Sequence, residues 1–486
     1  MHRHLAAFLV VVSAGAVLVL ELLSARLVAP YVGVTHEVYT ASIGVALGAI
    51  ALGAALGGRA ADVREGRLLI GWLFAAGGAL VLLARPLVLA IGPGLRGLGP
   101  IAAVILIGLA IALPVALLSA VAPVVVKMRL AGLEHAGATV GWFSALGTIG
   151  GLLGTFLTGF LLLQALPVST ALLVTGLLLL GLGTWQLAAR VFGEKRGLPP
   201  GSLSRTMGIA AITVVGGGLL LGTPTGCQLE TAYYCARVEP DPQRPSGRIL
   251  MLDDLRHAYV DVSDPTYLHF DYTQMFAEAI DDVFADDRPL RTLHVGGGGL
   301  TMQRWLDATR PDSEHTVLEL DPHVLDLVQD EMGVRTGPNL TVRAGDARIS
   351  IQDQPDNSYD LVIGDAFSQS AVPWHLATRE FAQEVDRVLR PDGLFVMNVI
   401  DYPPGDLVAA EIATIRSVLG EVRVLGEPPA LRGESGGNFV LVAGEGVGQL
   451  RSEAEAPAKL YQEWSERGRV LTDDWAPVDQ LLSPYA

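Results

Sequence analysis

Long apolar stretches dominate the first half of the chain, and short apolar runs that end in glycine or a carboxylate dominate the second half. A helix that crosses a bilayer needs about 20 mostly apolar residues. We therefore predict a membrane-spanning helix in each of six runs: 5–28, 38–58, 68–91, 101–126, 138–163 and 168–189. A seventh, weaker run of 24 uncharged residues lies between Arg205 and Glu230.

Four short apolar runs of the second half read as the strands of a parallel, doubly wound sheet. They are LRTLHV, HTVLELD, NLTVRAGDA and SYDLVIGDAF, and helical patterns follow the first two. Buried parallel strands have this near-continuous apolar character. Alternation and aromatic residues between Glu230 and Val262 predict a small β-sheet before this domain.

The residues that end these four runs are the candidates for a ligand site. In doubly wound sheets the ligand lies at the carboxyl ends of the strands. Glycines 296–299 allow a sharp turn and a close approach to backbone N–H groups. Glu319, 21 positions after Gly298, is suited to both hydroxyls of a ribose, Asp346 to an adenine amino group, and Asp365 to chemistry.

The glycine turn does not fit the dinucleotide fingerprint, because a glycine is missing at 301–302. It is closer to the turn of S-adenosylmethionine-type folds. A nucleoside-cofactor site is the favoured interpretation, and a sheet with a purely structural role is the alternative.

Charge divides the chain at the same place as hydropathy. Residues 1–225 carry a net charge of +7 and the remainder −23, with Lys459 the sole lysine of that acidic part. Such a charge excludes nucleic acid as a partner and favours cationic ligands such as polyamines. An acidic, solvated surface without any such ligand explains the same composition.

The positive charges predict a cytoplasmic N-terminus. Ten lysines and arginines lie at the ends of the runs that share the side of the N-terminus, and three lie at the alternate ends. Seven spans would then place the acidic half outside, and six would place it in the cytoplasm. Cys227 and Cys235, the two cysteines of the chain, would form a disulfide outside and remain free thiols inside. With no histidine pair nearby, we predict no metal site.

Several motifs of the second half resemble spermidine synthases. They are ETAYYCARV, GRILMLDDLRHAYV, DYTQMF, LHVGGGG, LELD, GDA and IGDAF, within 230–446. The whole chain resembles the bacterial membrane-fused type, through ELLSARLVAPYVG and GWFSALGTIGGLLG in the first half. The resemblance implies a multi-pass helical inner-membrane domain (1–225), a small β-rich part (226–272), a Rossmann-like methyltransferase-type domain (273–446) and a polar C-terminal helix and tail (447–486).

The resemblance also implies a reaction, the transfer of an aminopropyl group from decarboxylated S-adenosylmethionine to putrescine. Asp365 would orient and help deprotonate the attacking amine, and Tyr272 matches the tyrosine of the family's Y-H-E motif. The implied cofactor-binding residues are Gly296, Gly297, Gly298, Glu319, Asp346 and Ala347, and the implied substrate-binding residues are Gln274, His257 and Ser368. The expected partners are a small amine and the lipid bilayer, and a homodimer is left open.

The chain departs from the family at its amine-holding acids. The family's aspartate after the third glycine is Gly299 here, and the second acid of its catalytic turn is Ser368. The histidine and glutamate after the tyrosine are Thr273 and Gln274. These losses keep two alternatives open: an S-adenosylmethionine-dependent methyltransferase, and a transporter or sensor that binds a nucleoside or polyamine without catalysis.

Overall fold

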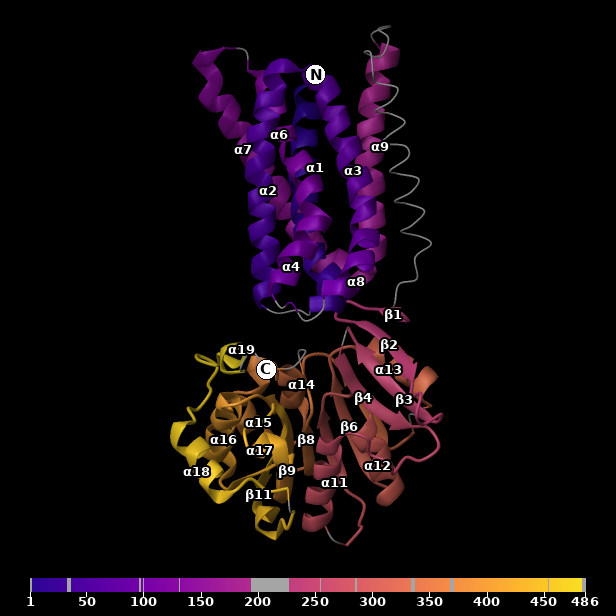
Figure 1. The fold of residues 1–486 in the computed structure, drawn as a ribbon, viewed down its shortest axis with the longest axis vertical. Helices are drawn as coiled ribbons and strands as arrows, with labels where there is room; N and C mark the ends of the chain where they lie inside the picture. The colour runs from indigo at the N-terminus through magenta and orange to yellow at the C-terminus, as the bar shows by residue number, and fades with distance from the viewer. Residues whose placement is uncertain are drawn as a thin grey trace. The chain divides into compact units, whose positions relative to one another are not determined.

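The computed structural model describes residues 2–32, 36–95, 98, 100–130, 132–193, 227–253, 255–284, 286–333, 337–367, 371–452 and 454–482 (Figure 1). Its contacts divide the chain into two compact units, Met1–Cys235 and Ala236–Ala486. Each unit has its own buried core, so each is described by itself.

The first unit is a bundle of long apolar helices. Within the described residues, six helical stretches have the length and composition of membrane spans: Arg3–Val32, Glu37–Val63, Gly66–Leu95, Ile101–Arg129, Ala136–Leu162 and Val168–Ala189. Each coincides with a predicted run, so the six helices are confirmed. The helices are α1 (Arg3–Val32), α2 (His36–Val63), α3 (Gly66–Ile91), α4 (Pro100–Ile107), α5 (Leu113–Ser119), α6 (Val121–Arg129), α7 (Ala136–Leu157), α8 (Leu163–Ala165) and α9 (Val168–Gly193). The predicted seventh run, between Arg205 and Glu230, falls outside the described residues from 206 to 226.

Glycines let helices α1 and α7 approach closely. A Cβ on Gly154 would overlap the backbone of Gly15, and one on Gly150 would overlap the backbone of Val11. Small residues at such crossings permit contact between the backbones of apolar helices. In a bilayer, burial from water contributes little to the association of such helices. Gly150 and Gly154 of this glycine-rich stretch are therefore explained by packing within the bundle.

The predicted small sheet has four strands in the order β1-β2-β3-β4. They are β1 (Leu229–Glu230), β2 (Cys235–Pro240), β3 (Gly247–Leu252) and β4 (Leu255–Asp261), and β2, β3 and β4 pair antiparallel. Cys227 and Cys235 form a disulfide with their Cα atoms 5.2 Å apart. Of the two states that the sequence left open for these cysteines, the structure has the bonded one.

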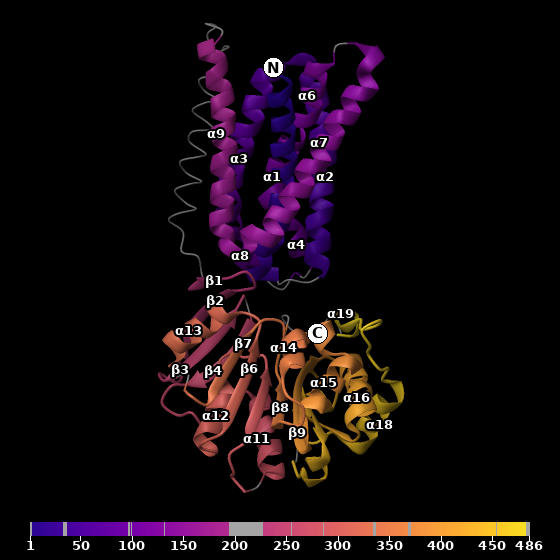
Figure 2. The ribbon, with the colours of Figure 1, turned by 180° about the vertical axis from the view of Figure 1, so that it is seen from behind.

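The large sheet of the second unit has seven strands in the order β10-β11-β9-β8-β5-β6-β7. Figure 2 labels β9, β8, β6 and β7 of this sheet. Strands β9, β8, β5, β6 and β7 are parallel, and β11 is antiparallel to both of its neighbours. The chain order reverses between β5 and β8, which places the switch point of the fold there. The predicted doubly wound sheet of methyltransferase type is confirmed.

Helices cover both faces of this sheet. Leu361 and Ile363 of β8 pack with α11 and α12, whereas Val362 between them packs with α15 and α16. The remaining bounds are α11 (Asp271–Val283), β5 (Arg291–Val295), α12 (Thr301–Thr309), β6 (Glu314–Glu319), α13 (Pro322–Met332), β7 (Leu340–Ala344), α14 (Ala347–Ser350), β8 (Tyr359–Gly364), α15 (Arg379–Val388), β9 (Leu389–Asp401), α16 (Asp406–Leu419), β10 (Val422–Gly426), α17 (Pro428–Leu431), β11 (Gly437–Gly444), α18 (Ala458–Arg467) and α19 (Val478–Leu481).

The C-terminal segment forms part of this core, which the polar composition of residues 447–486 did not predict. Trp464 of α18, Leu471 and Val478 are buried in the same cluster as α15 and α16. Three well-spaced apolar side chains are enough to bind an otherwise polar segment to a core.

Candidate active site

A pocket of about 270 Å³ lies at the switch point of the large sheet. Glycines 296–299 form one wall, and the ends of β5, β8 and β9, the start of α11 and strand β4 form the others. This is the position at which doubly wound folds bind their ligands.

The glycine turn cannot be replaced by ordinary residues without strain. Gly296 has φ +97° and Gly298 has φ +46°, a region that favours glycine. A Cβ on Gly296 would lie 2.5 Å from the carbonyl oxygen of Asp365. A Cβ on Gly298 would have no atom nearer than 3.7 Å and would extend toward His257, another pocket residue. The turn therefore leaves bare backbone facing a space that a ligand can enter.

Asp365 lies where β8 ends, and neutral groups hold its carboxylate. Tyr272 donates its hydroxyl to Oδ2 over 3.0 Å, and Asn398 donates Nδ2 to Oδ1 over 3.1 Å. Burial raises the pKa of Asp365 to about 6, although both hydrogen bonds act in the opposite direction. An ionised carboxylate without a cation beside it is a strong acceptor for an amine.

Tyr272 reaches this carboxylate from the first turn of α11. Its ring stacks on Phe270 and meets Phe276 edge to face, so its orientation is fixed by packing. Burial, together with the charge of Asp365, raises the pKa of the phenol well above its usual value. The hydroxyl therefore remains a donor at any physiological pH.

Glu319 ends β6 and braces the glycine turn. Its Oε2 accepts from the backbone N–H of Gly297 over 2.7 Å, and its Oε1 accepts from that of Asp321 over 2.9 Å. Burial is the main cause that raises its pKa, and the backbone hydrogen bonds oppose it. Each oxygen keeps a second lone pair, so the carboxylate fits a pair of ribose hydroxyls beside the pocket.

Asp346 and the buried Ala347 follow β7, the next strand along the sheet edge. Asp346 accepts from the backbone N–H of Arg348 over 2.8 Å, which caps α14, and its Oδ2 lies 3.3 Å from His375 Nε2. Like Glu319, these residues lie outside the lining of the pocket itself. Of the predicted cofactor residues, Gly296, Gly297 and Gly298 line the pocket with Asp365, whereas Glu319, Asp346 and Ala347 lie at strand ends outside its lining.

The three predicted substrate-binding residues do not share one location: one lines the pocket, one is exposed, and one falls outside the described residues. His257 lines the pocket, and burial lowers its pKa to about 4, so its imidazole is neutral near pH 7. Gln274 is exposed on α11 and donates to the carbonyl of Leu268, because it lies on the far side of the helix from Tyr272. Thr273 lines the pocket in its place. Ser368 falls outside the described residues.

Sequence reasoning missed several polar residues that line the pocket, including Asn398 and His294. Both lie inside apolar strand runs, GLFVMNVI and LRTLHV, and are almost completely buried. A polar residue within a buried strand must find partners, and that was the available signal.

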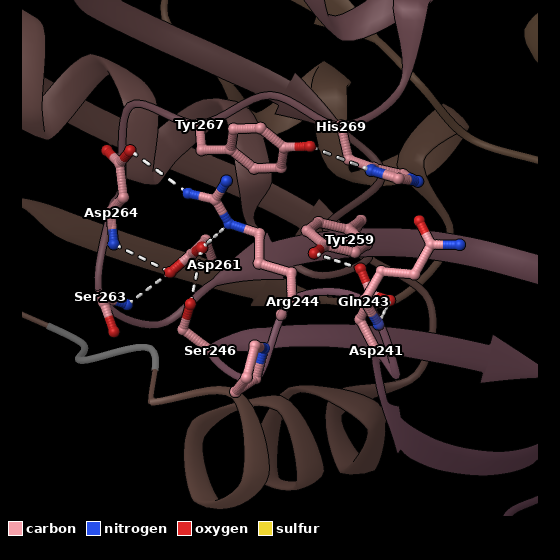
Figure 3. Close-up of polar contacts among 12 residues, drawn as sticks. Asp241, Gln243, Arg244, Ser246, Tyr259, Asp261, Ser263, Asp264, Tyr267 and His269 are labelled. Carbon is pink, nitrogen blue, oxygen red and sulfur yellow. Dashed lines mark hydrogen bonds and ion pairs between the residues drawn. The ribbon is translucent and has the colours of Figure 1, made fainter.

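A second polar cluster supports the loop that leads into α11 (Figure 3). Arg244 pairs with Asp261 and lies 3.7 Å over the ring of Tyr267. Tyr259 donates to Asp241 over 2.8 Å and stacks on His269, whose ring in turn meets Phe270 edge to face. Since Phe270 stacks on Tyr272, the cluster helps to fix the start of α11.

Comparison with known proteins places the second unit among two kinds of transferase. Residues 293–397 match the methyltransferase domain family. The polyamine aminopropyltransferase of Vibrio vulnificus is 29% identical over 236 residues, which cover 44% of this chain and 76% of that protein. The human eEF1A lysine and N-terminal methyltransferase is 26% identical over 152 residues, and the match spans 22% of its length.

Solved structures of similar proteins include a probable spermidine synthase from Corynebacterium glutamicum, at 25% identity and a TM-score of 0.43. That comparison covers 51% of this chain and 90% of the other. The spermidine synthase of Thermotoga maritima, at 16% identity and a TM-score of 0.34, covers 49% and 78%. The predicted resemblance of the C-terminal half to polyamine aminopropyltransferases is confirmed, and the relatives support a transferase of this type.

Proposed function

We propose that the second unit transfers an aminopropyl group from decarboxylated S-adenosylmethionine to a small amine such as putrescine. The observation that carries the proposal is the buried Asp365 carboxylate, which neutral donors orient beside a glycine turn at the switch point of the sheet. The similarity to polyamine aminopropyltransferases over 236 residues supports the same reaction.

The residues around the pocket fit such a donor. The glycine turn offers bare backbone at Gly298, and Glu319 retains lone pairs for ribose hydroxyls. Asp346 with Ala347 would lie at the adenine. When bound, the donor supplies a sulfonium-activated carbon, and the rest of the reaction is alignment of the amine with it.

Asp365 orients the attacking amine and takes part in its deprotonation. Its carboxylate accepts a hydrogen bond from the amine and stabilises the positive charge that develops on nitrogen. Tyr272 and Asn398 hold the two oxygens in place, because each donates to a different one. The pocket walls from Phe270, Ile363 and Phe367 limit the entry of water.

The acceptor should be an amine that needs few charged partners. Gly299 and Gln274 stand where the family has acids. Asp365 is the one acidic residue among those that line the pocket in the described part of the chain. A second ammonium group of a diamine would therefore find no further carboxylate there, and the lining includes the cationic Arg256. We expect monoamines and short diamines to be accepted with comparable efficiency.

An activity screen on the full-length protein in detergent tests the proposal. Decarboxylated and intact S-adenosylmethionine are each paired with a panel of mono- and diamines, and products are identified by mass. We expect aminopropylated amine and methylthioadenosine from the decarboxylated donor. Methyl transfer from the intact donor, without aminopropyl transfer, would overturn the proposal.

A methyltransferase is the second candidate, because residues 293–397 match the methyltransferase domain family and the amine-holding acids are absent. Both reactions displace a sulfide from the same class of donor, so the glycine turn and Glu319 would serve either. The third candidate is a transporter or sensor that binds its ligand without catalysis. It predicts that Asp365→Asn changes no transferase activity and that ligand binding persists.

For localisation, we propose an inner-membrane protein with a cytoplasmic N-terminus and an outward-facing second unit. The disulfide between Cys227 and Cys235 supports this, since disulfides persist in oxidising compartments. Residue 459 suits a labelling test, because the Lys459 side chain is 90% exposed. Lys459→Cys with Cys227→Ala and Cys235→Ala should react with an impermeant reagent on intact cells. Labelling only after lysis would show that the unit is cytoplasmic.

A further inference from the structure

A row of buried polar side chains leads away from the pocket on the α11–α12 face of the sheet. Thr292 and His294 lie on β5, and His315 lies on β6 with its Cα paired to that of Thr292. Their exposed fractions are 0%, 5% and 2%. Apolar residues would stabilise these positions more simply, so the polar row requires an explanation.

The row is a continuous series of hydrogen bonds from the pocket to the surface. His294 lines the pocket, and its Nε2 lies 2.8 Å from the Thr292 hydroxyl. That hydroxyl lies 2.7 Å from His315 Nδ1, and the two imidazoles also approach each other directly, with His294 Nε2 3.3 Å from His315 Nδ1. His315 Nε2 lies 3.1 Å from Asp307 Oδ1, and the Asp307 side chain on α12 is 43% exposed.

The direction of the proton donors follows from chemistry. A carboxylate only accepts, so His315 donates through Nε2 to Asp307, and its Nδ1 is left as an acceptor in the neutral ring. The Thr292 hydroxyl then donates to His315 Nδ1 and accepts from His294 Nε2. His294 Nδ1 is left with a free lone pair, and it has no partner among the residues that the structure describes.

The charged and titratable groups around this series favour a neutral resting state. On β8, Asp365 lines the same pocket, and on α11 Tyr272 is bonded to it. On α12, Gln303 donates its amide to Asp307 beside the His315 contact. Burial and the nearby His315 lower the pKa of His294 far below its usual value, so a proton that reaches His294 is readily passed on.

We propose that His294, Thr292, His315 and Asp307 form a proton relay that carries the proton released by the reacting amine from the pocket to solvent. The inference rests on the proposed function. The amine lone pair forms the new C–N bond, the C–S bond breaks, and its electron pair stays on sulfur. The nitrogen gives up a proton to His294 Nδ1, each member passes on the proton that it held, and Asp307 releases one to water. Rotation of the hydroxyl and return of the imidazole tautomers restore the series.

Two substitutions interrupt the relay at different points in the full-length protein. Thr292→Val removes the hydroxyl and leaves only the longer 3.3 Å contact between the two histidines, and Thr292→Ser, which keeps the hydroxyl, is the matched comparison. Asp307→Asn removes the surface base while retaining an oxygen that can accept from His315. Asp330→Asn, an exposed carboxylate on α13 outside the series, controls for the loss of surface charge.

Aminopropyl transfer is measured against pH and against the concentration of a small buffer base such as imidazole. We expect Thr292→Val and Asp307→Asn to lower kcat about tenfold or more with KM within about twofold, as general acid–base effects do. Imidazole should restore the rate of Asp307→Asn. Thr292→Ser should recover most of the rate that Thr292→Val loses, and Asp330→Asn should match the wild type. A purely structural role would give no rescue by buffer.

Two results separate the possible failures. Wild-type protein that transfers no aminopropyl group to any amine would refute the proposed function, and with it the relay as a step of that reaction. The relay alone would be overturned if the wild-type protein is active and the Asp307→Asn and Thr292→Val variants keep its kcat and pH profile. In that case imidazole would not change the rate of either variant.

Discussion

The second unit contains two pairs of a tyrosine and an aspartate, and they behave in opposite ways. Tyr272 donates to Asp365 in the pocket, and Tyr259 donates to Asp241 in the cluster of Figure 3. The pKa of Asp365 is raised to about 6, whereas that of Asp241 is lowered. The same two residue types therefore give a carboxylate suited to chemistry in one place and a structural acceptor in the other.

The difference comes from the surroundings of each carboxylate. Asp241 accepts a backbone hydrogen bond from Gln243 and lies in a cluster that contains the Arg244 guanidinium. Asp365 is buried with two neutral donors and no cation. Burial without charge compensation favours the protonated form, and hydrogen bonds from backbone groups favour the ionised form. The surroundings, rather than the residue pair, decide which carboxylate can take part in proton transfer.

The largest expected effect is that of Asp365→Asn. We expect kcat for aminopropyl transfer to fall by about 10²–10³-fold, because the amine loses its charged acceptor while Tyr272 and Asn398 keep the pocket shape. Asp241→Asn, in the other pair, is the matched control and should keep wild-type turnover. Equal kcat values for Asp365→Asn and the wild type, measured by product mass, would remove Asp365 from the mechanism.

Substitution of Glu319 tests the role of a carboxylate that backbone N–H groups hold beside the pocket. Glu319→Ala should weaken methylthioadenosine binding by about 1–3 kcal/mol, because paired hydroxyls lose a charged acceptor. Glu314→Ala, an exposed residue on the same strand, is the control. Calorimetry that shows unchanged affinity for Glu319→Ala would refute the ribose assignment.

Asp261 represents the structural kind of carboxylate in the cluster of Figure 3. It accepts from Ser246 over 2.8 Å and from the backbone N–H groups of Ser263 and Asp264, and it is buried. Asp261→Ala leaves these donors without an acceptor, so we expect a loss of about 1–3 kcal/mol in stability. Thermal unfolding measures it, with Asp330→Ala, an exposed carboxylate outside the cluster, as a control. An unchanged melting temperature would show that the cluster contributes nothing to stability.

The smallest effect concerns stability against pH, where the two kinds of carboxylate should have opposite signs. The pKa of Asp365 in the folded chain is about 6, above the unfolded value of about 4. Stability is therefore lost as pH rises from about 4 to about 6. The pKa of Asp261 is lowered to about 2, so its contribution is present above about 4 and lost as pH falls toward about 2.

The Asp365→Asn variant isolates the contribution of Asp365 to the pH dependence of stability. The variant should melt a few degrees above the wild type at pH 7, and the difference should vanish near pH 4, where both side chains are neutral. A difference of the opposite sign at pH 7 would show that the ionised carboxylate stabilises the fold.

The sequence by itself determined the architecture of both units. Six apolar runs of spanning length became six long helices, and four runs that end in glycine or acid became β5, β6, β7 and β8, which are parallel strands of one mixed sheet. Length and periodicity suffice for this, because burial of a whole helix or strand depends on many residues at once. The glycine turn could also be predicted from the sequence, because positive φ angles such as those at Gly296 and Gly298 favour glycine.

Only the tertiary structure decided which polar residues meet. Tyr272 and Asp365 are 93 positions apart, and their hydrogen bond depends on how α11 packs on the sheet. Nothing in the local pattern separates Gln274, which is exposed, from Thr273, which lines the pocket. Asn398 and His294 looked like interruptions of apolar strands, and they became pocket residues because β9 and β5 flank the strand that ends at Asp365. Hydrogen bonds join single atoms across long sequence separations, and so they are fixed by packing rather than by local composition.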